Sequence, residues 1–475
     1  MTDYSLPLKT PWQNGMIPEF RRHFPSVIDR LLVAVVLIAL HTNPFDAQQP
    51  VPYLISFIAA GMLFLRNTRR MTARETRFVV LFLLLALVCS IIAPRPQYMF
   101  ARMRSFAYLG ASVIAGFSLY LELRGWPKTT LARWAGVAAM ILLVGSLFEV
   151  ALEPVKKISD AYRYVNFSFP YEADLRDIYY HQGIRPKFFS SEPSYLGKHF
   201  AFFLICWLYV SKHRYRILQF IFLSAAGFVI IRSPVIFILT VAAFCYLLFD
   251  PSSRLIDRSQ ISKRVIVVGL GSILTAAFFG WIVWNSIGPR MMLFIGGDDK
   301  SSTVRLLASF EVVPKLLVFN PLTGIGVGGT EAFAYDVIAD NYEGIRGGLI
   351  REKIDQGMLE YLVQNWPANF IISFGLFGSC VGLFLLVRLQ RTVAYGKGFL
   401  FWPIFFAIGL TEGALNGLRI WTIFFVLLAY LVANETRNPM NSIGLTSCPR
   451  RRDGHLTRTD CRKGGRAKTA EEVIH

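Results

Sequence analysis

Long apolar runs alternate with short polar connections over most of this chain. Each run has roughly the length that a helix needs to cross a bilayer, about 20 residues, although several are shorter. Twelve runs can be drawn, near 26–41, 50–65, 78–93, 104–121, 134–151, 194–210, 217–231, 234–249, 265–284, 366–387, 399–417 and 419–433. No strand-rich region and no internal repeat accompanies them. The pattern therefore predicts an all-α polytopic membrane protein with about twelve transmembrane helices.

Arginine and lysine are concentrated in every second connection. The basic connections are 66–77, 122–133, 212–216, 254–264 and 388–397. Cytoplasmic loops carry an excess of basic residues, so this side is predicted to be the cytoplasm, with both termini on it.

Three arginines depart from this rule, because they lie at the exterior start of the fourth run. These are Arg95, Arg102 and Arg104. They either extend along the helix to reach the interface or attract an anionic lipid head group.

Two connections, 152–193 and 285–365, are long, and both are predicted to be exterior (periplasmic) segments. The other connections are short, which favours a compact helical bundle. Residues 1–433 thus form the predicted integral-membrane domain. The remainder, 434–475, is rich in Arg, Lys, Gly and Thr with little apolar content, so it is predicted to be a disordered basic cytoplasmic tail.

The composition agrees with the apolar runs and excludes other classes of protein. The chain of 475 residues is 54% hydrophobic and has a mean hydropathy of +0.44. A net charge of +19 would suggest nucleic-acid binding in a soluble protein, but here the basic residues lie between apolar runs and report topology instead. No dinucleotide fingerprint, P-loop or zinc-ligand cluster occurs. The first apolar run, 31–40, is not followed by a small-residue cleavage site, so no signal peptide is expected.

The cysteines give no sign of a disulfide framework, because none lies in a predicted exterior segment. Four lie in apolar runs and two in the tail: Cys89, Cys206, Cys245, Cys380, Cys448 and Cys461.

The first candidate site is the stretch 181–200, which leads from the first exterior segment into the sixth run. Glu192 precedes Pro193 there, and Arg185 and Lys187 lie a few residues earlier. Because proline suits a first helical turn, Ser191 or Glu192 could simply cap the helix. Alternatively, Glu192 is a general base or orients a hydroxyl, with its ionisation favoured by the neighbouring cations.

The second candidate is Arg232, which separates two apolar runs at an exterior turn of two residues. It is either a turn residue that reaches the interface or a phosphate clamp, since guanidinium donates in a planar, bidentate way.

The third candidate is 303–330. Apolar residues recur there at helical spacing and predict an amphipathic helix on the membrane, with Arg305 near its start. Asn320 and Pro321 then turn the chain, and Gly324 and Gly326 follow. Glycines let a backbone approach an anion closely, but a plain flexible loop would have the same composition.

The last candidates are polar residues at two later exterior ends. Gln364 and Asn365 open the tenth run, and Glu412, Asn416 and Arg419 surround a tight turn. These amides and charges either belong to helix caps and the interfacial belt or bind sugar hydroxyls.

In chain order, these features resemble the Wzy-type polysaccharide polymerase and O-antigen ligase superfamily of bacterial inner membranes. The likeness covers residues 180–380, and elsewhere only the number of runs agrees. Each motif is short, and the ordered set is more specific than any of its members. The matching residues are Arg185 with Glu192, Pro193, Ser194 and Gly197; Arg232 with Ser233; Arg305 with Asn320, Pro321, Leu322, Gly324 and Gly326; and Asn365.

The resemblance implies a GT-C-like membrane fold and a metal-independent, inverting glycosyltransferase without a cofactor in the bacterial inner membrane. The donor would be an oligosaccharide on undecaprenyl diphosphate, and a chain-length regulator and export proteins are the implied protein partners. Glu192 and Arg185 would be catalytic. The substrate-binding residues would be Arg232, Arg305, Asn320, Gly324, Gly326 and Asn365.

One departure bears on the choice within the superfamily. In the ligase branch a histidine commonly precedes the asparagine matched by Asn365, whereas Gln364 stands here and no histidine occurs in 285–365. We therefore expect a repeat-unit polymerase, with a ligase as the alternative. A transporter is disfavoured because charges gather at one face, with Asp29, Arg30 and Glu149 among the few exceptions.

Overall fold

A computed structural model describes residues 25–44, 53–167, 177–178, 183–249, 308–341, 365–394 and 401–435, together with residues 355 and 363. These residues form helices and turns, and no strand occurs among them. Internal contacts divide the chain into Met1–Glu435 and Thr436–His475, and every described residue belongs to the first unit. The predicted disordered tail, the ninth run 265–284, Arg305 and Gln364 lie outside the described residues.

Each of the other predicted runs coincides with a helix. In chain order these are α1 (Val27–Thr42), α2 (Leu54–Asn67), α3 (Ala73–Ile92), α4 (Met99–Leu123), α5 (Lys128–Ala151), α8 (Pro193–Val210), α9 (Arg216–Ile231), α10 (Pro234–Phe249), α15 (Trp366–Val393), α16 (Phe401–Gly409) and α17 (Leu418–Glu435). Among the described residues, four helical segments are long and apolar enough to cross a membrane: α3, Pro96–Leu123, α5 and α15.

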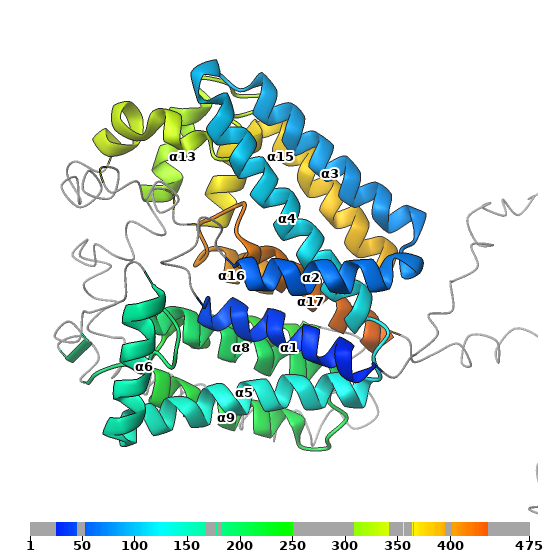
Figure 1. Cartoon of the computed structure of the whole chain (residues 1–475), viewed down its shortest axis with the longest axis vertical. Coiled ribbons are helices and arrows are strands. Elements are labelled where there is room, and N and C mark those ends of the chain that lie inside the picture. Colours follow the sequence, from blue (N-terminus) through cyan, green and yellow to red (C-terminus); the bar gives the residue numbers. More distant parts are fainter. Residues whose placement is uncertain are drawn as a thin grey trace, which may run out of the picture. The chain divides into compact units, whose positions relative to one another are not determined.

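The bundle is built around α17, whose residues from Leu418 to Ala433 are buried. It packs against α4, where a Cβ on Gly116 would lie 2.7 Å from the carbonyl oxygen of Trp421. Two groups of neighbouring helices are visible in Figure 1: α3 lies beside α4 and α15, and α5 lies beside α8 and α9. Large apolar side chains such as Ile141 remain exposed on the outer helices, as expected of a lipid-facing surface.

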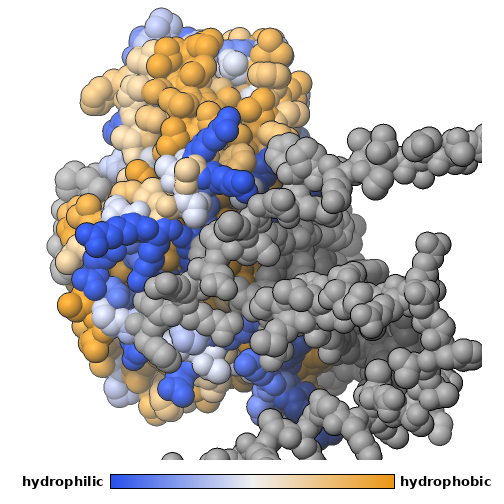
Figure 2. Space-filling view, turned by 90° about the vertical axis from the view of Figure 1, so that its right-hand side faces the viewer, coloured by the Kyte–Doolittle hydropathy of each residue, from blue (hydrophilic) through white to orange (hydrophobic). Residues whose placement is uncertain are grey.

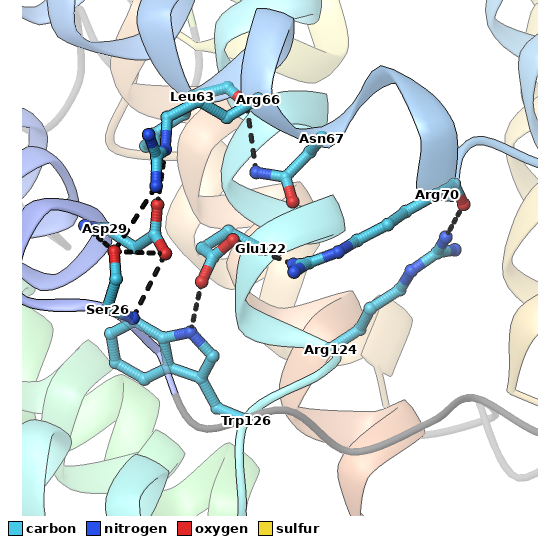
Figure 3. Close-up of polar contacts among 9 residues, drawn as sticks. All are labelled: Ser26, Asp29, Leu63, Arg66, Asn67, Arg70, Glu122, Arg124 and Trp126. Carbon is cyan, nitrogen blue, oxygen red and sulfur yellow. Dashed lines mark hydrogen bonds and ion pairs between the residues drawn. The ribbon is translucent and has the colours of Figure 1, made fainter.

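Two polar clusters link the helix ends that were predicted to be cytoplasmic (Figure 3). Arg66 Nε donates to Asp29 at 2.7 Å, which joins the end of α2 to the start of α1. Arg70 donates to Glu122 at 3.0 Å, and the Trp126 indole donates to the same carboxylate at 2.7 Å. Hydrophilic residues gather in patches on this side of the molecule (Figure 2). Charged groups are costly in hydrocarbon, so these links are consistent with one aqueous boundary.

The cluster of Arg70 and Glu122 continues into the protein through Arg124, which ends α4. It pairs with Glu75 and also donates to the backbone carbonyl of Arg70. Glu75 in turn completes a capping box with Thr72 at the start of α3. One carboxylate therefore both starts α3 and holds the end of α4 against it.

The first segment that was predicted to be exterior begins with α6 (Glu153–Asn166), which is amphipathic and crosses the end of α5 (Figure 1). In the second, the described α-helix is α13 (Ser309–Leu317), and the start of the predicted pattern lies outside the described residues. Its buried face, Val312 and Leu316, packs in a small core with Ile338 and Ile372 rather than resting on lipid. The stripe that the sequence assigned to the membrane is a different face: Phe310 is 40% exposed, and Val313 and Leu317 are half-buried.

The eleventh predicted run, 399–417, is wrong at its outer end. The helix α16 ends at Gly409, and 410–417 is a turn. Gly413, Asn416 and Gly417 favour turns over helix, and this turn carries Glu412.

Helix α15 is broken at Gly375, whose φ of 67° and ψ of −175° are not helical. The segment 320–326 docks at the break: Ile325 N–H donates to the Ile372 carbonyl at 3.0 Å, and Leu376 N–H donates to the Pro321 carbonyl at 2.8 Å. The break frees backbone groups that the docked segment then satisfies, as required inside an apolar bundle.

Candidate functional site

The segment 183–192 contacts the ends of α1, α5 and α9 and the helix α6. Contacts from neighbouring elements fix its backbone. The Glu149 carboxylate accepts hydrogen bonds from the Lys187 N–H at 3.0 Å and from the Phe188 N–H. Phe188 and Phe189 have φ values of 36° and 61°, a left-handed conformation that costs a non-glycine residue about 1–3 kcal/mol. Strain of this kind is often found at functional sites.

Arg185 is buried and paired within this exterior segment. Its Nε lies 2.9 Å and its Nη2 2.8 Å from Oδ1 of Asp177. The pairing fixes the guanidinium in place, so Arg185 presents a preorganised cation at the outer end of the bundle.

Glu192 occupies the N-cap position of α8, but its side chain makes no capping hydrogen bond. The carboxylate instead accepts a hydrogen bond from Ser194 Oγ at 2.8 Å, and the residue is half-buried. The Glu192 carboxylate therefore does not cap α8. Ser194 Oγ donates one hydrogen bond to the carboxylate, and an ionised carboxylate has several acceptor sites.

Two glycines bring α8 and the Arg232 turn together. A Cβ on Gly197 would lie 2.4 Å from the Cβ of Ser233, and a Cβ on Gly183 would lie 2.2 Å from Nη1 of Arg232. Arg232 ends α9 in a left-handed conformation, with φ of 53°. The close approach of backbone to these two residues brings the motifs from 183–197 and 232–233 into one cluster.

A buried ion pair beside this cluster was missed in the sequence. Lys198 is fully buried in α8, and its Nζ pairs with Glu412 and lies 3.3 Å from the Thr411 carbonyl oxygen. The Tyr195 ring lies 4.4 Å from Lys198 Nζ and 4.1 Å from the Arg419 guanidinium carbon. The only sequence signal was a lysine four residues after Ser194, hidden in an apolar run.

Two histidines were also missed. His41 Nε2 lies 2.9 Å from the Phe188 carbonyl oxygen, and its Nδ1 lies 2.9 Å from Nδ1 of His199. A carbonyl can only accept, so His41 Nε2 carries the proton and, for neutral rings, His199 Nδ1 donates to His41 Nδ1. The pair therefore ties the strained Phe188 turn to α1 and α8.

The remaining predicted substrate-binding residues have structural contacts elsewhere. Asn320 closes a turn through Thr323 at 2.8 Å, and Asn365 caps α15 by accepting from the Ala368 N–H at 2.7 Å. The Gly324 and Gly326 amides donate to the carbonyls of Asn320 and Ser373. These amides already have protein acceptors, so packing against α15 accounts for the glycines. A substrate-binding role for these residues stays a prediction.

Two of the three arginines in 95–104 bind the second segment that was predicted to be exterior. Arg95 pairs with Asp336 and lies 4.1 Å from the Phe333 ring centroid, and Arg104 lies 3.7 Å from Glu331. Arg102 is fully buried and donates to the backbone carbonyls of Pro94 and Arg95. Protein partners thus explain them better than either lipid interpretation.

Within the described ranges, no group of three or more His, Cys, Asp or Glu residues could hold a metal ion. No family model matches the chain, and no curated protein matches it.

Proposed function

We propose that this chain is a membrane glycosyltransferase of the Wzy type, which polymerises oligosaccharide repeat units carried on undecaprenyl diphosphate at the exterior face. One observation carries the proposal. Arg185, Glu192 and Arg232 are residues of the resembling motifs, and the segments that carry them lie together at one end of an apolar helical bundle. Two guanidinium groups at this boundary, one of them paired with Asp177, suit a lipid-linked anionic substrate.

The proposed reaction is a displacement at the anomeric carbon of the donor sugar. An acceptor-sugar hydroxyl attacks the anomeric carbon of the donor, the bond from that carbon to the diphosphate breaks, and the anomeric configuration inverts. Arg232 would stabilise the charge that develops on the leaving diphosphate, because guanidinium binds phosphate oxygens in a bidentate way. Arg185, held by Asp177, would add a second fixed guanidinium as a hydrogen-bond donor.

Glu192 would accept the proton that the hydroxyl loses as the new bond forms. Its bond to Ser194 Oγ orients the carboxylate without neutralising it. The product is a glycan longer by one repeat unit, together with free undecaprenyl diphosphate.

The test is complementation of a strain in which the chromosomal copy is deleted, with polymer and lipid-linked single units both measured. Removing a general base costs about 10²–10⁴ in rate, so Glu192→Gln should abolish long polymer and cause single units to accumulate. Arg232→Lys keeps the charge but loses bidentate donation, and should reduce polymer at least tenfold.

Matched controls are Glu153→Gln and Arg104→Lys, which change exposed exterior residues of the same types. Both should retain wild-type polymer at wild-type membrane levels. Normal polymer from Glu192→Gln and Arg232→Lys, at normal membrane levels, would overturn the proposal.

A further inference from the structure

The helix α6 has its polar side turned toward the protein. Its buried residues are all polar: Ser159, Arg163 and Asn166. Its large exposed hydrophobic side chains are Ile158, Tyr164 and Val165, which are 61%, 59% and 55% exposed. A helix on the surface of a water-soluble protein has the reverse arrangement, with its apolar stripe facing the core. The exposed face of α6 is therefore suited to contact with an apolar partner.

The exposed apolar residues of α6 form one stripe along the helix. Four exposed residues, spaced four, three and four apart, share one face. We call them the α6 stripe, and they are Pro154, Ile158, Ala161 and Val165. Lys157 and Tyr164 border the stripe on one side, and Lys157 Nζ lies 3.9 Å from Oε1 of Glu153. An apolar stripe bordered by lysine and tyrosine is typical of a helix that lies in the interface of a bilayer.

The place of α6 in the chain and in the bundle indicates that the partner is lipid. It begins at Glu153, directly after Leu152, and α5 ends at Ala151 after a span long and apolar enough to cross a membrane. Because α6 crosses the end of α5 (Figure 1), it lies along the boundary of that span instead of continuing through it. Exposed apolar residues continue from the last turn of α5 to this connection, at Phe148, Val150 and Leu152. The surface that α5 presents to lipid therefore leads to the α6 stripe.

The opposite side of α6 binds the segment that leads to the candidate general base. Ser159 Oγ accepts a hydrogen bond from the Phe189 N–H at 3.1 Å, and Arg163 Nε donates to the Ser190 carbonyl at 3.1 Å. The ring of Tyr162 lies edge-on to that of Phe189, with the two centroids 5.3 Å apart. The position of α6 therefore helps to set the position of this backbone.

We propose that α6 is an interfacial helix whose stripe contacts the phospholipid bilayer, and that this contact holds the segment 188–190 in place through Ser159 and Arg163. The lipid contact does not depend on the proposed function, whereas its effect on polymerisation rests on that function. Ser159 and Arg163 are positioning residues, because they act on the reaction only through the backbone that precedes Glu192.

The first experiment places the photoreactive residue p-benzoylphenylalanine at single positions of the full chain in membranes of the expression host. Mass spectrometry then identifies what each position captures. The test positions are Ile158 and Val165 in the stripe, and the matched control is Glu153, which is exposed on the same helix but lies off the stripe. We expect phospholipid adducts at both test positions, at roughly fivefold or more above the yield at Glu153.

Two outcomes would overturn the lipid contact. One is capture of protein in place of lipid at both test positions, either a second copy of the chain, seen as a dimer of twice the mass, or another protein. The stripe would then be a protein interface. The other is a phospholipid yield at Ile158 and Val165 no higher than that at Glu153.

The second experiment tests the positioning role by complementation of the deletion strain. Ile158→Asp places a charge in the stripe, which is costly at the edge of hydrocarbon, and should lower polymer by roughly threefold or more at wild-type membrane levels. Ile158→Leu keeps the stripe apolar, and Lys157→Gln changes an exposed residue beside it, so both should retain wild-type polymer. Arg163→Met removes only the contact with Ser190 and its neighbours, and should lower polymer while the stripe still captures lipid.

The outcomes separate the two parts of the proposal. Normal polymer from Ile158→Asp or from Arg163→Met, at normal membrane levels, would overturn the positioning role and leave the lipid contact standing. If the wild-type chain makes no polymer, the proposed function fails and the positioning role with it, whereas the phospholipid adducts still decide the interfacial contact.

Discussion

The buried pair of Lys198 and Glu412 offers a sharp test of how this bundle is held together. The Lys198 side chain has no exposed surface and that of Glu412 is 9% exposed. Neutralising one partner leaves the other charge buried, as in Glu412→Leu or Lys198→Met. Replacing both together by Met and Leu leaves no charge and conserves much of the volume.

The magnitudes follow from burial. Breaking a buried ion pair by removing one partner costs about 3–5 kcal/mol, whereas replacing the whole pair by apolar residues is often neutral or stabilising. For Glu412→Leu the remaining ammonium keeps the Thr411 carbonyl at 3.3 Å and the Tyr195 ring at 4.4 Å, so we expect the lower part of that range. The double variant should lose less than about 1 kcal/mol, which gives a coupling energy of several kcal/mol.

The assay is unfolding of the full chain in detergent, followed by fluorescence of a thiol-reactive dye. Cys89 and Cys206 are buried and become reactive only when the bundle opens. The two single variants should melt on the order of 5–10 °C below wild type. The matched control is the exterior pair Glu153 and Lys157, which lie 3.9 Å apart and are 67% and 75% exposed. Its single variants should change stability by less than about 0.5 kcal/mol.

The reasoning is refuted if the double variant is as unstable as the sum of the two single variants. Additive losses would mean that each side chain contributes separately through packing. It would also be refuted if both single variants melt with wild type.

Three further predictions concern other contacts. Glu149→Ala leaves two buried N–H groups without an acceptor, so stability should fall by about 2–6 kcal/mol in the same assay. Gly324→Ala should cost about 2–4 kcal/mol, because φ is +69° and the added Cβ would lie 2.3 Å from the Ile372 carbonyl oxygen; wild-type melting would contradict this. The hydrogen bond from Arg95 lowers the pKa of Asp336 below its usual 3.8, so the folded state binds that proton more weakly than the unfolded state. The stabilisation is complete above about pH 4 and is lost as pH falls through the lowered pKa, so Arg95→Met should reduce the difference in melting temperature between pH 7 and pH 3.

The positions of the helices could be predicted from the sequence, because each run carries its own signal. The apolar content of a helix can be recognised within the run itself, and charged residues bound each run because they are costly in hydrocarbon. Capping residues such as Thr72 mark where helices start. The predicted run 399–417 was too long because it also relied on apolar content alone. Apolar content continues past Gly409, but the turn residues after it favour a bend over another helical turn.

The candidate site could be predicted only in part. The motif spacing pointed to Arg185, Glu192 and Arg232, and the structure gathers the segments that carry them. The sequence could not indicate that the Glu192 carboxylate does not cap α8. Nor could it indicate that Gly324 is required by close packing against α15. Both facts depend on neighbouring atoms that the local sequence does not specify.

By itself, the sequence determined that this is a chain of apolar helices with charges at their ends, because burial in lipid constrains each residue separately. Only the tertiary structure decided which charges meet. Lys198 and Glu412 are far apart in the chain, as are Arg95 and Asp336, and α15 is broken where a distant segment docks. Such pairs depend on how helices pack, and packing depends on the shapes of many side chains at once rather than on any local pattern.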